Sequence, residues 1–231
     1  AEGVLALMCD STNAMREGDS PSEKAVGENL TKIIAEAKGR VAVTSFSSNV
    51  GRIRTVMLAA RDAGRSVIVL GRSMKRMLEV SGELGYMEGM PETLGEDDFA
   101  SIPRQNCVVI LTGSQGESRA ALAKLANDEM RSIKFVAGDC VIFSSRTIPG
   151  NERAIIDIKN KLIDQGIEII TDEQQLVHVS GHPRRNELKK MYSWVKPQIL
   201  VPVHGEAAHL TAQAALGANE GISQVARVRN G

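Results

Sequence analysis

Short runs of valine, isoleucine and leucine alternate along the chain with longer amphipathic segments. The apolar runs predict strands at residues 4–9, 40–45, 66–70, 107–111, 140–144, 167–170, 176–179, 199–203 and 224–228. Most of the segments between them are long enough to form a helix that crosses over the sheet, which is the pattern of a mostly parallel sheet. The sequence therefore predicts an α/β fold in which helices flank a mostly parallel sheet.

The sequence also predicts where helices begin and end. At Ser20-Pro21-Ser22-Glu23, Ser20 can accept hydrogen bonds from first-turn amides and Glu23 can reach back, which predicts a helix that runs to Lys38. Further helices are predicted at 49–63, 74–84, 117–128, 151–165, 185–195 and 206–216. Residues 85–105 are acidic, contain two prolines and show no clean period, so we expect a long surface excursion there.

Composition narrows the class of protein. The 28 basic residues balance the 28 acidic ones, so binding to nucleic acid would need a local patch of charge. Cys9, Cys107 and Cys140 each lie in an apolar run, which predicts buried thiols and no disulfide. No apolar stretch approaches the roughly 20 residues that cross a bilayer, and we expect a soluble intracellular protein without a membrane partner.

The two ends suggest that a sheet continues past them. The chain starts at Ala1 without a methionine and closes on Asn230-Gly231, a pair that usually makes a turn between strands. We therefore expect a longer parent protein. The alternative is a native short protein with loose ends.

The loops after the predicted strands hold the candidate chemistry, because α/β proteins place ligands at strand ends. His204 follows the apolar run ILVPV, where an imidazole can bind a metal or move a proton, or can simply be a core or capping residue. His178 and His182 flank Ser180-Gly181, whose small side chains would let an anion approach the backbone; the alternative is a tight turn that needs glycine.

Other loops carry weaker signals. Asp10 ends another strand and can orient a histidine or hold a metal, or can form an Asx turn. Residues 112–117 resemble a phosphate loop, but they lack its lysine, and a plain turn with a helix cap is favoured. Ser48-Asn49 can likewise cap the helix that follows. Cys9 has no adjacent histidine that would activate it as a nucleophile. Arg184-Arg185 can bind phosphate or can be a solvated helix start.

Taken in order, six motifs resemble bacterial ribonuclease J, a β-CASP ribonuclease of the metallo-β-lactamase superfamily. They are Asp-Ser-Thr-Asn, Phe-Ser-Ser-Asn-Val, Thr-Gly-Ser-Gln-Gly-Glu, Ile-Pro-Gly-Asn-Glu, His-Val-Ser-Gly-His and Pro-Val-His-Gly-Glu. The resemblance covers essentially the whole chain. It implies that residues 1–20 and 176–231 belong to a partial metallo-β-lactamase lobe and that residues 21–175 form the β-CASP domain.

The resemblance also implies roles. His204 would be a zinc ligand, His182 a proton donor or transition-state stabiliser, and Asp10 the partner that orients His182. The RNA backbone would be held by Ser48, Asn49, Val50, His178, Val179, Ser180, Gly181 and His182. The complete enzyme would use two zinc ions for endonucleolytic and 5′-to-3′ exonucleolytic cleavage in RNA processing and mRNA decay, in the cytoplasm and as a homo-oligomer.

The chain departs from the family pattern in ways that affect activity. The family's His-x-His-x-Asp-His cluster is missing, since no histidine precedes His178, and its C-terminal domain is missing too. Gly51 stands where several relatives have a histidine. With His204 as the one direct ligand, a zinc site needing three protein ligands is incomplete, so we expect this chain alone to be inactive and its incomplete lobe to expose apolar surface. The alternative function is a non-catalytic module that binds RNA or a nucleotide.

Overall fold

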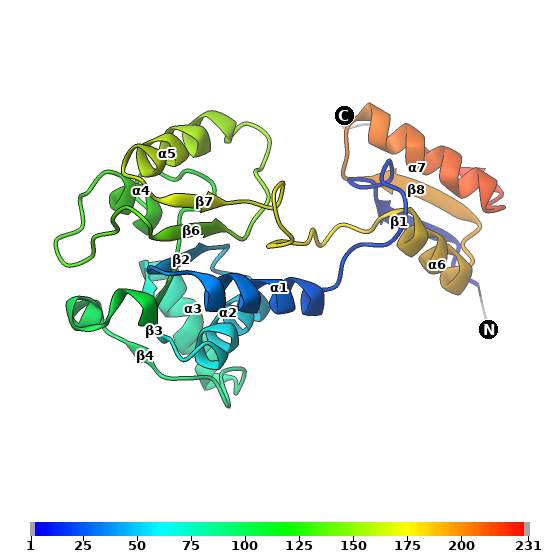
Figure 1. The fold of residues 1–231 in the computed structure, drawn as a ribbon. Coiled ribbons are helices and arrows are strands. Elements are labelled where there is room, and N and C mark those ends of the chain that lie inside the picture. Colours follow the sequence, from blue (N-terminus) through cyan, green and yellow to red (C-terminus); the bar gives the residue numbers. More distant parts are fainter. Residues whose placement is uncertain (1–2, 229–231) are drawn as a thin grey trace. The chain divides into compact units, whose positions relative to one another are not determined.

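The structure, a computed structural model, describes residues 3–228 and divides into two compact units. The larger unit is Ser22–Val179, and the smaller unit combines the chain up to Pro21 with the chain from Ser180 onward. Figure 1 shows the elements of each unit. The predicted assignment of residues 1–20, 21–175 and 176–231 to family lobes stays a prediction.

The larger unit is built on a six-stranded, fully parallel sheet. Its strands follow the order β4-β3-β5-β2-β6-β7. Their bounds are β2 (Val41–Thr44), β3 (Ser66–Leu70), β4 (Thr93–Leu94), β5 (Cys107–Leu111), β6 (Cys140–Phe143) and β7 (Glu168–Ile170). Every residue of β2, β5 and β6 is buried, and all but Thr44 are apolar, because both faces of the sheet are covered.

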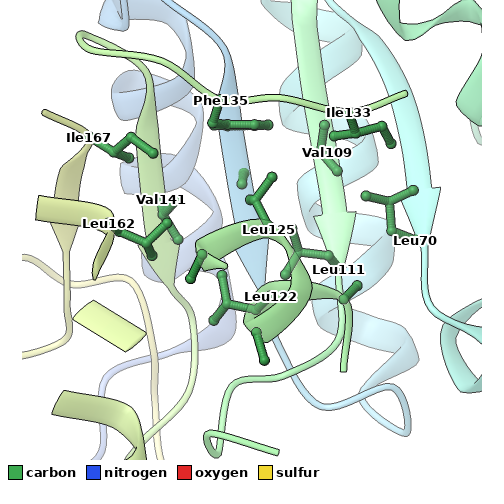
Figure 2. Close-up of a cluster of buried hydrophobic side chains, with 14 of the residues drawn as sticks. Leu70, Val109, Leu111, Leu122, Leu125, Ile133, Phe135, Val141, Leu162 and Ile167 are labelled. Carbon is green, nitrogen blue, oxygen red and sulfur yellow. The ribbon is translucent and has the colours of Figure 1, made fainter. Parts of the chain in front are cut away.

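Helices cover both faces of this sheet. One face carries α1 (Glu23–Glu36), α2 (Val50–Asp62) and α3 (Arg72–Glu83), and the other carries α4 (Ala121–Ala126) and α5 (Glu152–Asp164) (Figure 1). Alternate strand residues enter separate cores: Val108 and Ile110 pack toward α1 to α3, whereas Val109 and Leu111 pack toward α4 and α5. Figure 2 shows the second core, in which Phe135 and Leu122 lie over the strands. The α/β fold with a mostly parallel sheet is confirmed.

The stretch from 85 to 105 is only partly a surface excursion. It contains β4 and two short 3-10 helices, η1 (Glu96–Ser101) and η2 (Arg104–Asn106). Phe99 is 3% exposed and Ile102 8% exposed, and both join the core beside α4 and α5. The acidic composition of the segment gave no sign that Phe99 and Ile102 are buried, so the prediction of a surface segment was wrong for these two residues.

The smaller unit is a three-stranded parallel sheet in the order β1-β8-β9, covered by two helices. Its elements are β1 (Ala6–Asp10), β8 (Ile199–Val203), β9 (Gln224–Val225), α6 (Arg185–Val195) and α7 (Ala207–Asn219). Cys9 and Leu200 pack against Tyr192 and Leu216 of the helices. Met8, whose side chain alternates to the opposite face, is 70% exposed, and Leu5 is 64% exposed, so the expected exposed apolar surface is confirmed.

Several predicted elements differ in the structure. Residues 176–179 form no strand, because the backbone carbonyl of Val177 accepts hydrogen bonds from the side chains of Arg52 and Ser144 instead of a neighbouring strand. The first helix is capped by Ser22, whose Oγ accepts from Ala25 N, while Ser20 Oγ donates to Glu187. The helix predicted at 117–128 is reduced to α4.

Three smaller findings complete the description. All three cysteines are buried and free. Among the described residues, no helix combines the length and apolar content that crossing a membrane requires. The predicted Asn230-Gly231 turn lies outside the described residues.

Candidate functional site

Strand register brings Asp10 and His204 together. Asp10 is the last residue of β1 and is paired with Val203, the last residue of β8. Because the two strands are parallel, their carboxyl ends share one edge of the sheet, and the residue after Val203 lies beside Asp10. His204 turns there with a left-handed backbone (φ 57°), and its Nδ1 lies 3.3 Å from Asp10 Oδ2.

His182 reaches the same carboxylate from the loop before α6. Its Nδ1 lies 2.6 Å from Asp10 Oδ2, and its ring stacks on that of His204 with 5.2 Å between the ring centroids. The backbone is fixed on both sides, because His182 N donates to Ser180 Oγ (3.2 Å) and Asn13 Nδ2 donates to the His182 carbonyl (2.9 Å). One carboxylate oxygen therefore contacts two imidazoles.

The Asp10 carboxyl is held in its charged form. Burial disfavours the charge, but hydrogen bonds from the Thr12 amide and from His182 outweigh burial, so the pKa of Asp10 lies below its usual value. The Thr12 amide donates to Asp10 Oδ1 over 2.7 Å, which leaves Oδ2 for the imidazoles. A carboxylate so placed can fix the ring orientation of a histidine and stabilise its protonated form.

Thr12 contacts His204 in a way that the sequence analysis missed. Its Oγ1 lies 2.9 Å from His204 Nδ1 and 3.0 Å from the carbonyl oxygen of the same residue. The hydroxyl has one proton, and the carbonyl can only accept it, so we assign the Nδ1 proton to His204 as donor to Thr12 Oγ1. The lone pair of His204 then lies on Nε2. The Asp-Ser-Thr-Asn motif drew attention to the loop but gave Thr12 no role.

A buried polar network supports this loop from behind. Ser11 donates to Gln213 Oε1 of α7, and Gln213 Nε2 lies 3.1 Å from the hydroxyl of Tyr192 in α6. Burial raises the pKa of Tyr192 to about 12, so its hydroxyl stays protonated and can bond to the network. Ser11 and Gln213 are fully buried. The network joins the strand end to both helices of the smaller unit, and no local sequence signal predicted it.

The other predicted substrate segments lie in the larger unit. Asn49 Oδ1 accepts the amide of Arg52 (3.0 Å) and caps α2, Ser48 is exposed, and Val50 is the first residue of that helix. His178 Nδ1 is buried without a hydrogen-bond partner among the described residues. Burial first, and then the charge of Arg52, lower the pKa of His178.

The His-Val-Ser-Gly-His motif is divided between the two units. His178 and Val179 close the larger unit, whereas Ser180, Gly181 and His182 begin the second segment of the smaller one. The structure brings His182 together with Asp10 and His204. It describes Ser48, Asn49, Val50, His178 and Val179 only within their own unit.

Two further candidates, Gln115 and Cys9, have structural roles. Gln115, in the 112–117 loop, accepts the Ile148 amide (2.9 Å) and donates to the Arg146 carbonyl (2.9 Å), so this loop braces a neighbouring one. That agrees with the turn that the sequence favoured over a phosphate loop. Burial raises the pKa of the Cys9 thiol, which disfavours the nucleophilic thiolate.

The donor set fits one part of a metal site. Asp10, His182 and His204 offer ligand atoms within 4.8 Å of one another, and among the described residues they are the one group of three or more such side chains that could hold an ion. Both Nδ1 atoms already face Asp10 or Thr12, which leaves Nε2 of His182 and Nε2 of His204 as the free imidazole atoms. A carboxylate that orients a histidine ligand does so by holding one ring nitrogen while the other stays free for the metal. The roles of the three residues remain predictions.

Comparisons with known proteins agree on one family. The model of the ribonuclease J β-CASP domain matches residues 38–162, and the model of the Zn-dependent metallo-hydrolase RNA specificity domain matches residues 166–226. Ribonuclease J of Sinorhizobium meliloti is 69% identical over 230 residues, which is 100% of this chain and 41% of that protein. Ribonuclease J of Mycolicibacterium smegmatis is 42% identical over 95% of this chain and 40% of that protein, and that of Synechocystis is 38% identical over 100% of this chain and 36% of that protein. The chain spans about two-fifths of the length of these relatives.

Proposed function

Because the chain belongs to the ribonuclease J β-CASP family, we propose that it forms part of a zinc-dependent ribonuclease that processes and degrades RNA. The observation that carries the proposal is the single carboxylate oxygen of Asp10, which contacts Nδ1 of both His182 and His204 at the end of two parallel strands. Cleavage within RNA and from its 5′ end, a cytoplasmic location and assembly into a homo-oligomer are part of the proposal.

The proposed chemistry assigns different work to the two histidines. His204 Nε2 would hold a zinc ion, which when bound supplies an activated hydroxide and neutralises phosphate charge. His182 Nδ1–H donates to Asp10 Oδ2, so in the imidazolium form its Nε2–H is the proton that can pass to the leaving oxygen of the RNA chain. The negative charge of Asp10 stabilises the imidazolium before that transfer, as a carboxylate does beside a catalytic histidine.

Binding of the RNA backbone completes the proposal. The hydroxyl of Ser48, the amides at the start of α2 and the small residues Ser180 and Gly181 are suited to phosphate oxygens. Ser48 and Gly181 are exposed, so solvent and ligand can reach them. We propose that these segments position the RNA, with His182 serving both binding and proton transfer.

A histidine-substitution series in the full-length parent tests the proposal. His182→Ala should lower kcat on RNA by about 10²–10⁴-fold, the usual contribution of a positioned acid. His204→Ala should lower both activity and bound zinc, measured by elemental analysis. His209→Ala is the matched control, because His209 lies in the same unit and its Nδ1 accepts only the Glu206 amide among the described contacts. Near-normal activity in both His182→Ala and His204→Ala would refute the proposed roles.

The alternative function, an RNA-binding module that does not cut, rests on the small number of candidate metal ligands. The described residues offer one candidate ion-binding group, and Asp10 in it is engaged with imidazoles. This chain alone would then bind RNA without cutting it. Incubation of the full-length parent with labelled RNA and added zinc distinguishes the two: stable, uncut complexes support a binding module, and cleavage that His182→Ala abolishes supports the ribonuclease.

A further inference from the structure

A cleft of about 530 Å³ opens in the larger unit beside the 112–117 loop, whose Thr112 and Glu117 line it. It lies at the carboxyl ends of β3 and β5, where Leu70 and Thr112 line it, together with the first turn of α3 and the segment leading into α4. In the sheet order, β5 separates β3 from β2, which precedes Ser48–Val50. Parallel α/β sheets bind ligands at this edge, and pockets of about 300–1,000 Å³ hold small molecules.

The charges around the cleft do not balance. Arg72, Lys75, Arg119 and Lys124 line it, with Glu96 and Glu117 as the acidic side chains. The chain as a whole carries 28 basic and 28 acidic residues, so this local excess does not reflect general basicity.

Both carboxylates are already engaged by other groups. Glu96 Oε1 binds Lys75 Nζ at 2.7 Å, and Glu117 Oε2 accepts the Gln115 amide at 3.0 Å. Arg72, Arg119 and Lys124 are exposed, and none of the three has an ion pair or side-chain hydrogen bond in the described part of the chain. Three cations therefore line the cleft outside any described ion pair, and Glu117 is the one lining carboxylate without a cationic partner among the described residues, so the cleft carries a net positive charge.

The rest of the lining suits a phosphate attached to an organic group. Thr112 contributes a hydroxyl, while Leu70, Ala121 and Met130 contribute apolar surface that a nucleobase can cover. Arginine and lysine are the usual protein donors to phosphate oxygens. We propose that this cleft binds the phosphate of a nucleotide, either free or within an RNA chain, as a site separate from Asp10, His182 and His204.

NMR titration of the purified chain tests the site with uridine 5′-monophosphate, uridine and a short single-stranded RNA without a terminal phosphate. The nucleotide should shift the amide signals of Gly71, Thr112 and Arg119, and uridine should not. An Arg119→Ala/Lys124→Ala double variant should weaken binding at least about tenfold, since each charge-assisted contact is worth more than a neutral hydrogen bond. The side chains of Arg119 and Lys124 are exposed, so the double variant should keep the fold.

A matched double variant controls for charge. Lys24→Ala/Arg61→Ala removes two exposed cations of the same unit that do not line this cleft, so it should bind as the parent chain does. Shifts with the mononucleotide alone identify a free nucleotide as the ligand, and matching shifts with RNA that weaken with salt identify the RNA backbone. Equal binding by the cleft variant and the control, or no shifts at the cleft with either phosphate ligand, would overturn the proposal. The test needs no catalysis, so it is independent of the proposed nuclease activity.

Discussion

Arg52 is a fully buried arginine whose counter-ion, Glu23, is half exposed. This difference in burial predicts that removing either partner alone lowers the free energy of unfolding by a different amount. Its guanidinium contacts both Glu23 carboxylate oxygens at 2.7 and 2.9 Å, and its Nη1 contacts Ser144 Oγ at 2.6 Å and the Val177 carbonyl at 3.0 Å. The side chain of Arg52 is 0% exposed and that of Glu23 is 53% exposed. The informative variants are Glu23→Gln, Arg52→Met and the double variant.

The two single substitutions should have different costs. Glu23→Gln leaves a buried charge without its partner, which costs about 3–5 kcal/mol in a dry core and, with Glu23 half in solvent, about 2 kcal/mol here. Arg52→Met removes that charge, and water can solvate the remaining carboxylate. The Val177 carbonyl keeps its 2.7 Å hydrogen bond from Ser144 Oγ, so the loss should be only about 1 kcal/mol. The double variant should cost no more than Arg52→Met, which gives a coupling of about 2 kcal/mol.

Urea unfolding followed by circular dichroism measures the free energy of unfolding of the larger unit, which holds most of the helices. Trp194, the single tryptophan, belongs to α6 of the smaller unit, so its fluorescence serves as an internal control. The urea dependence of this fluorescence should be the same in the parent chain and in the three variants. Additive effects of the two substitutions, or a larger loss in Arg52→Met than in Glu23→Gln, would refute this account of the buried charge.

Three further predictions follow from the described contacts. Burial holds the pKa of His178 below its ordinary 6.5, so as pH falls below 6.5 the unfolded chain takes up a proton first and the folded chain loses stability. The difference between the urea midpoints of the parent chain and His178→Gln should therefore be constant at neutral pH and above and should change below pH 6.5; a constant difference at every pH would contradict this. Thr12→Val should shift the imidazole ¹⁵N signals of His204 toward a mixture of tautomers, whereas Thr12→Ser should not, and unchanged signals in the valine variant would contradict the assigned proton. Burial raises the pKa of Cys107 to about 11 and that of Cys140 to about 12, so neither thiol should react with a disulfide reagent at pH 8 until urea unfolds the chain; fast labelling of the folded chain would show that they are accessible.

The sequence predicted best where one local rule decides the structure. The strands Ser66–Leu70, Cys107–Leu111 and Ile199–Val203 have the predicted bounds, because each is a continuous apolar run with polar or turn-forming residues beside it. Asp10 and His204 were expected at strand ends, and parallel pairing brings such ends to one edge. Local pattern was sufficient for these elements.

Prediction failed where distant side chains decide. Val177 lies in an apolar run, yet the guanidinium of Arg52, 125 residues earlier, takes its carbonyl and replaces strand pairing. Phe99 lies in an acidic segment, yet it is buried beneath the Arg40 side chain, 4.4 Å from the ring centroid. Gln213, on α7, bonds to Ser11 across 202 positions, which no local period can reveal. These contacts depend on the packed fold.

The pairing of β1 with β8 sets an order of events during synthesis. Ala6 pairs with Ile199, so 193 positions of the chain separate β1 from its partner, and β1 must wait for their synthesis before it can pair. The larger unit, Ser22–Val179, is continuous and can fold in that interval. Asp10 therefore meets His204 only after β8 has been synthesised, and a message cut short between Val179 and β8 yields the complete larger unit without the site. At about 5–20 residues per second, the delay before β1 finds its partner is on the order of ten seconds or more.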